Sequence, residues 1–92
     1  MPRWLQSGPR RDICAVLYGE GELRRKEIKA RLQDQYDDRI DTKRFDGMLA
    51  KLIDGGHVDR RVEGIHDVYA LTDAGEAGVE VHAAWLREQT GR

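Results

Sequence analysis

The chain has 92 residues, of which 39% are hydrophobic and 36% are charged, and its formal net charge is −1. These values fit one small soluble domain, and they exclude a disordered segment or a second hydrophobic core. The longest apolar run is only a few residues and residues 1–7 lack the apolar stretch of a signal peptide, so we expect neither a membrane partner nor secretion. The single cysteine, Cys14, cannot form an internal disulfide and favours a reducing, cytoplasmic location.

The near-neutral net charge hides an uneven distribution. Residues 1–33 hold eight Lys or Arg and four Asp or Glu, whereas the acidic excess lies in residues 34–92. Such an asymmetry permits a basic surface on a nearly neutral protein.

The first half of the chain predicts three helices. The first helix is expected to start at Gly8–Pro9 and to stop at Gly19–Gly21, and apolar residues recur at helical spacing between these positions. The second is expected from about Arg25 to Tyr36, because Ile28, Leu32 and Tyr36 share one stripe. The third begins at Asp41 or Thr42 as N-cap, carries the apolar stripe Phe45, Leu49, Leu52 and Ile53, and ends at Gly55–Gly56.

The period then changes from helical to alternating. Residues 57–62 and 67–71 are typical of strands, and residues 63–66 of a hairpin loop between them, while Leu23 predicts a very short extended piece. Thr72 is expected to cap a fourth helix. The stripe of that helix is predicted to contain Ala74, Gly78, Val81 and Trp85, with His82 and Leu86 at its edge. This order predicts a mainly α fold with a small β-hairpin, the winged helix-turn-helix arrangement.

Two segments carry a family resemblance. Residues 52–58 look like the end of a recognition helix that leads into a wing, and residues 67–75 are similar to the Y-x-L-T-x-x-G stretch that closes the wing in PadR-like regulators. The resemblance covers roughly residues 9–90. It implies a dimeric repressor whose third helix enters the major groove, whose wing touches the flanking backbone and whose last helix joins two copies. Two features depart from it: one helix only is expected after the wing, and the third helix has no Asn or Gln.

The whole chain is accordingly expected to be one winged-helix domain. Residues 1–8 would form an N-terminal arm, residues 9–71 the winged helix-turn-helix, and residues 72–90 the dimerisation helix.

Candidate DNA-binding residues follow from this arrangement, because Lys and Arg neutralise phosphates and the exposed start of a recognition helix reads bases. On the third helix they are Thr42, Lys43, Arg44, Gly47 and Lys51; Arg44 could fork onto guanine, and Gly47 leaves room for close approach. On the wing they are Arg60, Arg61 and His66, and on or before the second helix Arg24, Arg25, Lys26 and Lys29.

Each candidate has a plainer alternative. A basic run is most often the solvated face of a helix, and Thr42 could serve only as a helix cap. Asp41 and Asp46 would repel phosphates, so they must point elsewhere or accept a hydrogen bond from cytosine. His57, His66 and His82 lack zinc-ligand spacing, so we expect no metal and no cofactor.

The apolar and aromatic residues near the two ends predict self-association. Trp4, Val81, Trp85 and Leu86 are expected at a homodimer interface. A second interpretation makes Trp4 and Trp85 a shared pocket for a flat aromatic effector, and we favour the interface. Cys14 is expected to be a small buried hydrophobe rather than a redox switch.

Three classes of function compete. A sequence-specific DNA-binding transcription regulator explains most features. A winged-helix protein-interaction module in a larger assembly would explain the near-neutral charge and the sparse base-reading face. An enzyme is disfavoured, since no nucleophile set, phosphate loop or metal signature stands out.

Overall fold

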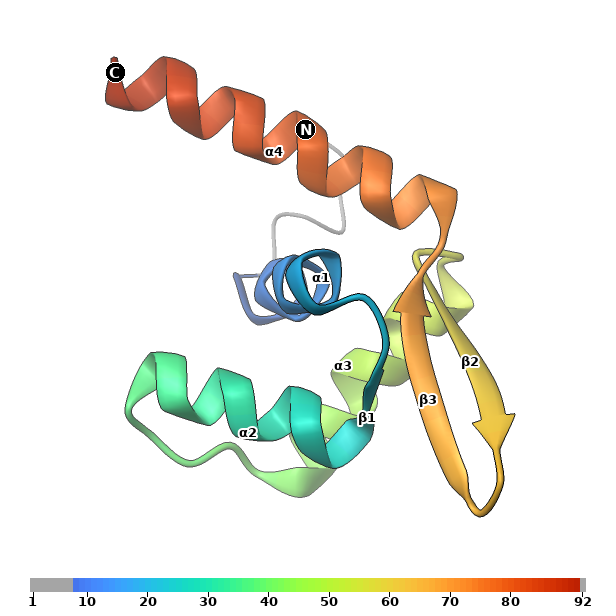
Figure 1. The fold of residues 1–92 in the computed structure, drawn as a ribbon. Coiled ribbons are helices and arrows are strands. Elements are labelled where there is room, and N and C mark those ends of the chain that lie inside the picture. Colours follow the sequence, from blue (N-terminus) through green and yellow to red (C-terminus); the bar gives the residue numbers. More distant parts are fainter. Residues whose placement is uncertain (1–7, 92) are drawn as a thin grey trace.

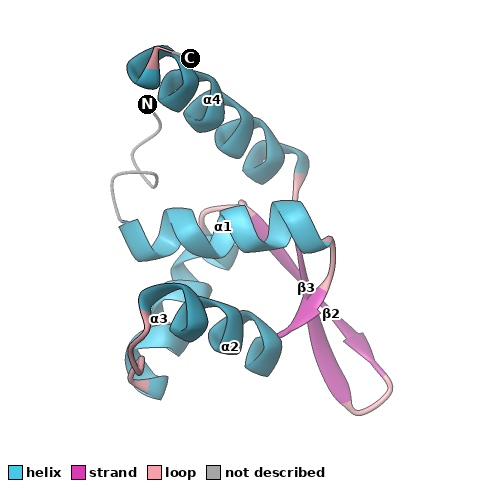
Figure 2. Ribbon diagram, turned by 60° about the vertical axis from the view of Figure 1, so that its left-hand side comes forward, coloured by secondary structure: helices cyan, strands magenta, loops and turns pink. Residues whose placement is uncertain are grey.

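The computed structural model describes residues 8–91, which form four helices and three strands. In chain order these are α1 (Gly8–Glu20), β1 (Leu23–Arg24), α2 (Arg25–Tyr36), α3 (Thr42–Asp54), β2 (Val58–Glu63), β3 (His66–Leu71) and α4 (Asp73–Thr90). Residues 1–7, and with them Trp4 and nearly all of the expected N-terminal arm, lie outside the described part. In both ribbon views α1 lies between α4 on one side and α2 and α3 on the other, with the sheet at one end (Figures 1 and 2). This is the winged-helix arrangement that the sequence predicts.

The wing differs from the expected two-stranded hairpin in two respects. The sheet has the antiparallel order β1-β3-β2, because Leu23 and Arg24 pair with Tyr69 and Val68 and so add a third strand. The expected four-residue loop is also shorter, since His66 pairs with Glu63 at the start of β3. Only residues 64 and 65 remain in the turn, where Gly64 adopts a φ of 63° that favours glycine.

One hydrophobic core lies where the three-helix unit meets the sheet. The stripes predicted for the first three helices are buried or partly buried apart from Tyr36, and Ile13, Ile28 and Phe45 are fully enclosed. The complete buried set is Ile13, Cys14, Leu17, Leu23, Ile28, Leu32, Phe45, Leu49, Leu52, Val58 and Tyr69. Tyr36, predicted to continue the α2 stripe, is instead exposed, and its hydroxyl donates to Asp12 Oδ2.

The ends of α3 fix the orientation of the helix. Asp41, one of the two residues expected as N-cap, accepts the Arg44 backbone N–H at 2.9 Å. The helix stops at Gly55, and Gly56 reverses the chain in a left-handed conformation with a φ of 79°. The His57 N–H then bonds to the Leu52 carbonyl at 2.9 Å, and the chain enters the wing directly.

The start of α4 explains the Thr–x–x–Gly part of the sequence motif. Thr72 caps the helix by accepting the Gly75 N–H at 3.1 Å, and its own hydroxyl donates to the Gly56 carbonyl at 2.6 Å. A Cβ on Gly75 would lie 2.2 Å from the His57 carbonyl oxygen, so no larger residue fits without movement of the backbone. The glycine therefore lets α4 pack against the loop between α3 and β2.

The stripe predicted for α4 is buried only in part, since Gly78 alone of its four members is buried. Gly75 and Gly78 are buried and Val79 packs against the core, whereas Ala74 is exposed. The helix is rotated in this way because the glycine-mediated contact with His57 determines which side faces the core. Beyond its first turns α4 projects past α1 (Figure 1). Val81 is exposed on this part of the helix.

Candidate nucleic-acid interface

The exposed face of α3 carries all five predicted recognition-helix residues. Thr42, Lys43, Arg44, Gly47 and Lys51 are all exposed, because Phe45, Leu49 and Leu52 hold the opposite face in the core. A Cβ built on Gly47 meets no atom within 4 Å, and Ala50 beside it is exposed. The centre of the face is therefore free of bulk, as close approach to a DNA groove requires.

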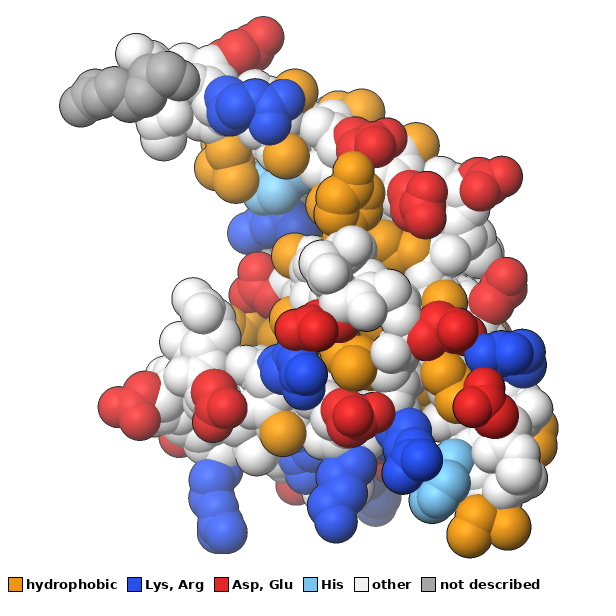
Figure 3. Space-filling view, in the orientation of Figure 1, with side chains coloured by type: hydrophobic (Ala, Val, Ile, Leu, Met, Phe, Trp, Pro, Cys, Tyr) orange, Lys and Arg blue, Asp and Glu red, His pale blue; other side chains and the backbone are white. Residues whose placement is uncertain are grey.

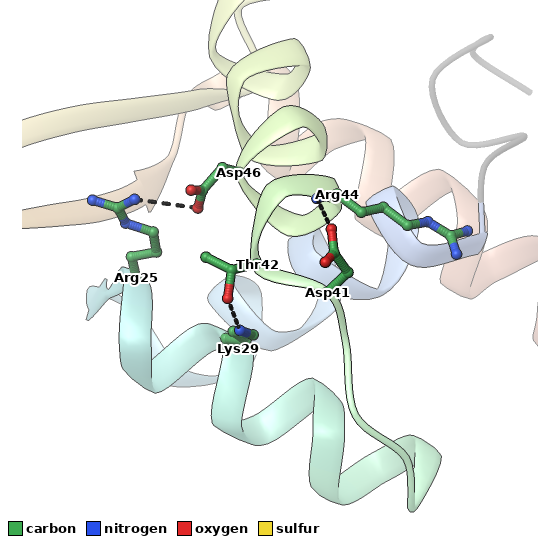
Figure 4. Close-up of polar contacts among 6 residues, drawn as sticks. All are labelled: Arg25, Lys29, Asp41, Thr42, Arg44 and Asp46. Carbon is green, nitrogen blue, oxygen red and sulfur yellow. Dashed lines mark hydrogen bonds and ion pairs between the residues drawn. The ribbon is translucent and has the colours of Figure 1, made fainter.

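Two polar contacts join this face to α2. Lys29 Nζ donates to Thr42 Oγ1 at 2.6 Å, and Arg25 Nη1 donates to Asp46 Oδ1 at 3.2 Å (Figure 4). The hydrogen bond and the charge of Asp46 raise the pKa of Arg25. The N-cap of α3 is Asp41, so Thr42 is not the helix cap. Its hydroxyl instead accepts a hydrogen bond from α2. The contacts set how α3 is held on α2.

Arg44 points away from these contacts, toward α1 (Figure 4). It lines a hollow of about 310 Å³ together with Pro9, Arg10, Gly47, Met48 and Lys51. The sequence reasoning missed Arg10, although the excess of basic residues in the first third of the chain was a signal for it. The hollow brings cations from α1 and α3 together at one edge of the exposed α3 face.

The wing places its two adjacent arginines on opposite faces of the sheet. Arg60 is opposite the buried Tyr69, whereas Arg61 is opposite Val68 on the outer face. Arg61 Nη2 lies 2.5 Å from Glu22 Oε2 and 2.9 Å from Glu63 Oε2, so two carboxylates already hold its charge. Neither acidic partner was anticipated from the sequence.

Arg60 instead faces α3. It lines a hollow of about 160 Å³ between α2, α3 and the wing, whose other lining residues are Arg25, Asp46, Leu49, Ala50, Ile53, Asp67 and Tyr69. His66 is exposed at the start of β3, and Ile65 in the turn is 94% exposed. Arg60 therefore lies toward α3. Arg61 joins the wing to the α1–β1 connection through its ion pair with Glu22.

The remaining candidates are Arg24, at the end of β1, and Lys26 in α2, and both are exposed. The Arg24 backbone N–H donates to Glu27 Oε1 at 2.9 Å and so helps to begin α2, which leaves its side chain available. In Figure 3, Lys and Arg side chains project along the lower edge, below α2 and α3 and beside the wing, whereas acidic and apolar side chains dominate the surface of α4. The predicted DNA side and the predicted dimer side thus lie on opposite faces.

The predicted dimer face is exposed. Val81 is 54% exposed, and Trp85 and Leu86 are each 44% exposed. The Trp85 ring stacks on His82 with 5.8 Å between the ring centroids. Trp4, the other expected anchor, lies outside the described residues, so its pairing with Trp85 in an interface or an effector pocket stays a prediction.

Other chemistry has little support within residues 8–91. No group of three or more His, Cys, Asp or Glu side chains in this part could hold a metal ion. Cys14 is fully buried, and burial raises the pKa of its thiol to about 12, which opposes formation of the reactive thiolate. None of the described helices has the length and apolar character to cross a membrane.

Comparisons with known proteins agree with this fold. No protein-family model matches the sequence, and no curated protein does. RosR of H. salinarum superposes with a TM-score of 0.84 at 25% identity, over 90% of this chain and 76% of RosR. F93 from STIV, a winged-helix DNA-binding protein, gives 0.73 at 20% identity over 84% and 85% of the two chains. The oxidised form of MarR from E. coli gives 0.70 at 20% identity, over 84% of this chain and 55% of MarR.

Proposed function

We propose that the chain is a cytoplasmic, DNA-binding transcription regulator that inserts α3 into the major groove. The observation that carries this proposal is the α3 face itself: it presents Lys43, Arg44 and Lys51 around an unobstructed centre at Gly47. The winged-helix fold, which this chain shares with F93, supports the insertion of α3 into the major groove. Residues 9–71 would contact DNA, and residues 72–90 would join the protomers, as in PadR-like regulators.

The proposed contacts divide by chemistry. Base reading falls to the first turns of α3, where Thr42, Lys43 and Arg44 lie, and Lys51 contacts the backbone beside them. Arg60 and His66 reach the flanking backbone from the wing, while Arg61 is a weaker candidate because Glu22 and Glu63 already neutralise it. Lys26 and Lys29 of α2 contact phosphates together with Arg24, while Arg25 is a weaker candidate because it pairs with Asp46.

The salt dependence of binding can be estimated from the cations that make no ion pair with any residue in 8–91. Among the residues assigned to phosphates, these are Arg24, Lys26, Lys29, Lys51 and Arg60. Each neutralised phosphate contributes about 0.9 to the slope of log K against log salt, so these five predict a slope of about −4 to −5 per protomer.

We infer that the regulator is a homodimeric repressor joined through α4. The exposed Val81, Trp85 and Leu86 form an apolar surface, and burying Trp85 in both copies would contribute a few kcal/mol at about 25 cal/mol per Å². Trp85→Ala should convert the dimer to a monomer in sedimentation and weaken DNA binding. Ile65→Ala, an apolar truncation at the distant wing tip, is the control that should leave the mass unchanged; a Trp85→Ala variant that stays dimeric would refute the interface.

The proposed function is tested by fluorescence-anisotropy binding to the DNA upstream of the protein's own gene and to a scrambled duplex, at several salt concentrations. We expect tight, salt-steep binding that prefers the upstream DNA. A two-fold dimer further predicts half-sites about one helical turn apart. Equal binding to both duplexes would indicate an architectural DNA binder. Binding to neither at low salt would instead favour a protein-interaction module.

A further inference from the structure

An acidic side chain stands in the middle of the surface assigned to DNA. Asp46 lies in the second turn of α3 and lines the hollow between α2, α3 and the wing. Its side chain is 39% exposed, and Arg25 holds one of its oxygens, Oδ1, at 3.2 Å. The other oxygen, Oδ2, makes no hydrogen bond with any residue in 8–91 and remains able to accept one.

Neither stability nor phosphate binding explains an acid in this position. Both side chains of the Arg25–Asp46 pair are exposed, and exposed ion pairs contribute little to the free energy of folding. A carboxylate also repels the DNA backbone, whereas a Lys or Arg at position 46 would have added affinity for phosphates. Asp41, which precedes α3, differs because it caps the helix through the Arg44 N–H.

The chemistry of base edges offers an explanation. A carboxylate can only accept, so it needs a base that presents a donor in the major groove. Guanine and thymine present acceptors where a carboxylate would approach, and adenine places its N7 acceptor beside the N6 donor. Cytosine alone presents the N4 donor without a neighbouring acceptor. The small residues beside Asp46, Gly47 and Ala50, allow the helix to come close enough for a short side chain to reach it.

We propose that Asp46 is a specificity-determining residue that reads cytosine through Oδ2, while Arg25 holds Oδ1 and offsets the charge. This inference rests on the proposed DNA binding. Arg25 is then a positioning residue. From α2 it holds Asp46 in one rotamer through the hydrogen bond to Oδ1, and such a supporting contact keeps a binding group in place.

The test is selection of binding sites from a pool of random duplexes with wild-type protein, Asp46→Ala and Asp46→Asn, followed by anisotropy titrations on single-base variants of the selected site. The wild type should select a cytosine at one position of each half-site and discriminate against other bases there by about tenfold. Asp46→Ala should lose that preference and bind scrambled DNA more tightly. Asp46→Asn should shift it to adenine, whose N6 and N7 edge an amide matches.

Asp34→Asn, which removes one exposed acid from α2, is the charge-matched control. It should leave the cytosine preference intact, and thermal melting of each variant shows whether it is folded. The inference is overturned if Asp46→Ala keeps the wild-type preference at every position, or if the wild type binds duplexes without any preference. If the wild type binds no duplex at all, the proposed function fails first, which is a different and recognisable outcome.

Discussion

Gly47→Ala separates the stability of the protein from its proposed function. Glycine inside a helix costs about 0.5–1 kcal/mol relative to alanine, because it loses more backbone freedom on folding. The new Cβ would meet no atom within 4 Å, so no clash offsets this gain. The free energy of unfolding should therefore rise by about 0.5–1 kcal/mol, which corresponds to about 2–8 °C in Tm for a domain of this size.

DNA binding should change in the opposite direction. The added methyl would stand at the centre of the exposed α3 face, where α3 is proposed to approach the groove. Inserting a methyl into a close-packed contact costs about 1–3 kcal/mol, so affinity should fall by about 5- to 150-fold. Gly19→Ala is the matched control: this α1 glycine also has nothing within 4 Å of a built Cβ, and its substitution should leave DNA affinity unchanged. A Gly47→Ala protein that melts higher and binds DNA as tightly as wild type would refute the placement of α3.

Three further predictions concern other parts of the fold. Gly75→Ala should lower the free energy of unfolding by about 1–3 kcal/mol despite the better helix propensity, since its Cβ would lie 2.2 Å from the His57 carbonyl oxygen; a chemical denaturation midpoint equal to wild type would contradict this. Arg60→Ala should weaken DNA binding and reduce the magnitude of the salt slope by about 1, whereas Arg61→Ala, whose charge two acids already hold, should change the slope much less; equal slopes for the two variants would show that the wing is not polarised in this way. Cys14, with its buried thiol of raised pKa, should react with a thiol reagent only as fast as the domain unfolds, and rapid labelling of the native protein at pH 7 would contradict that.

Local signals in the sequence were sufficient for most of the secondary structure. The range predicted for α2 matches the structure, because a stripe at helical spacing is encoded within the helix itself. Thr72 and Asp41 cap their helices as expected, since a cap acts over only three residues. The strand β1 is different: a two-residue segment has no periodicity, and it becomes a strand only because β3 lies beside it.

The arrangement of the candidate site depended on tertiary contacts that no local pattern reveals. Arg60 and Arg61 are indistinguishable as neighbours in the sequence, and only the register with β3 assigns one to the α3 side and the other to the outer face. The Arg25–Asp46 pair joins residues 21 positions apart. The buried face of α4 likewise follows from the contact between Gly75 and the His57 carbonyl rather than from the apolar residues of the helix.

These pairings change what the basic first third of the chain implies. Arg25 and Arg31 are both held by acids, at 3.2 and 3.0 Å, so fewer cations remain for phosphates than the sequence count suggests. A surface that neutralises part of its own charge gains less from counterion release and leaves more of its binding free energy to contacts with bases. The same pairing places a compensated carboxylate, rather than a bare one, in the hollow between α2, α3 and the wing. The near-neutral net charge, which at first favours a protein-interaction module, is therefore equally consistent with a regulator that depends on base contacts more than on phosphate contacts.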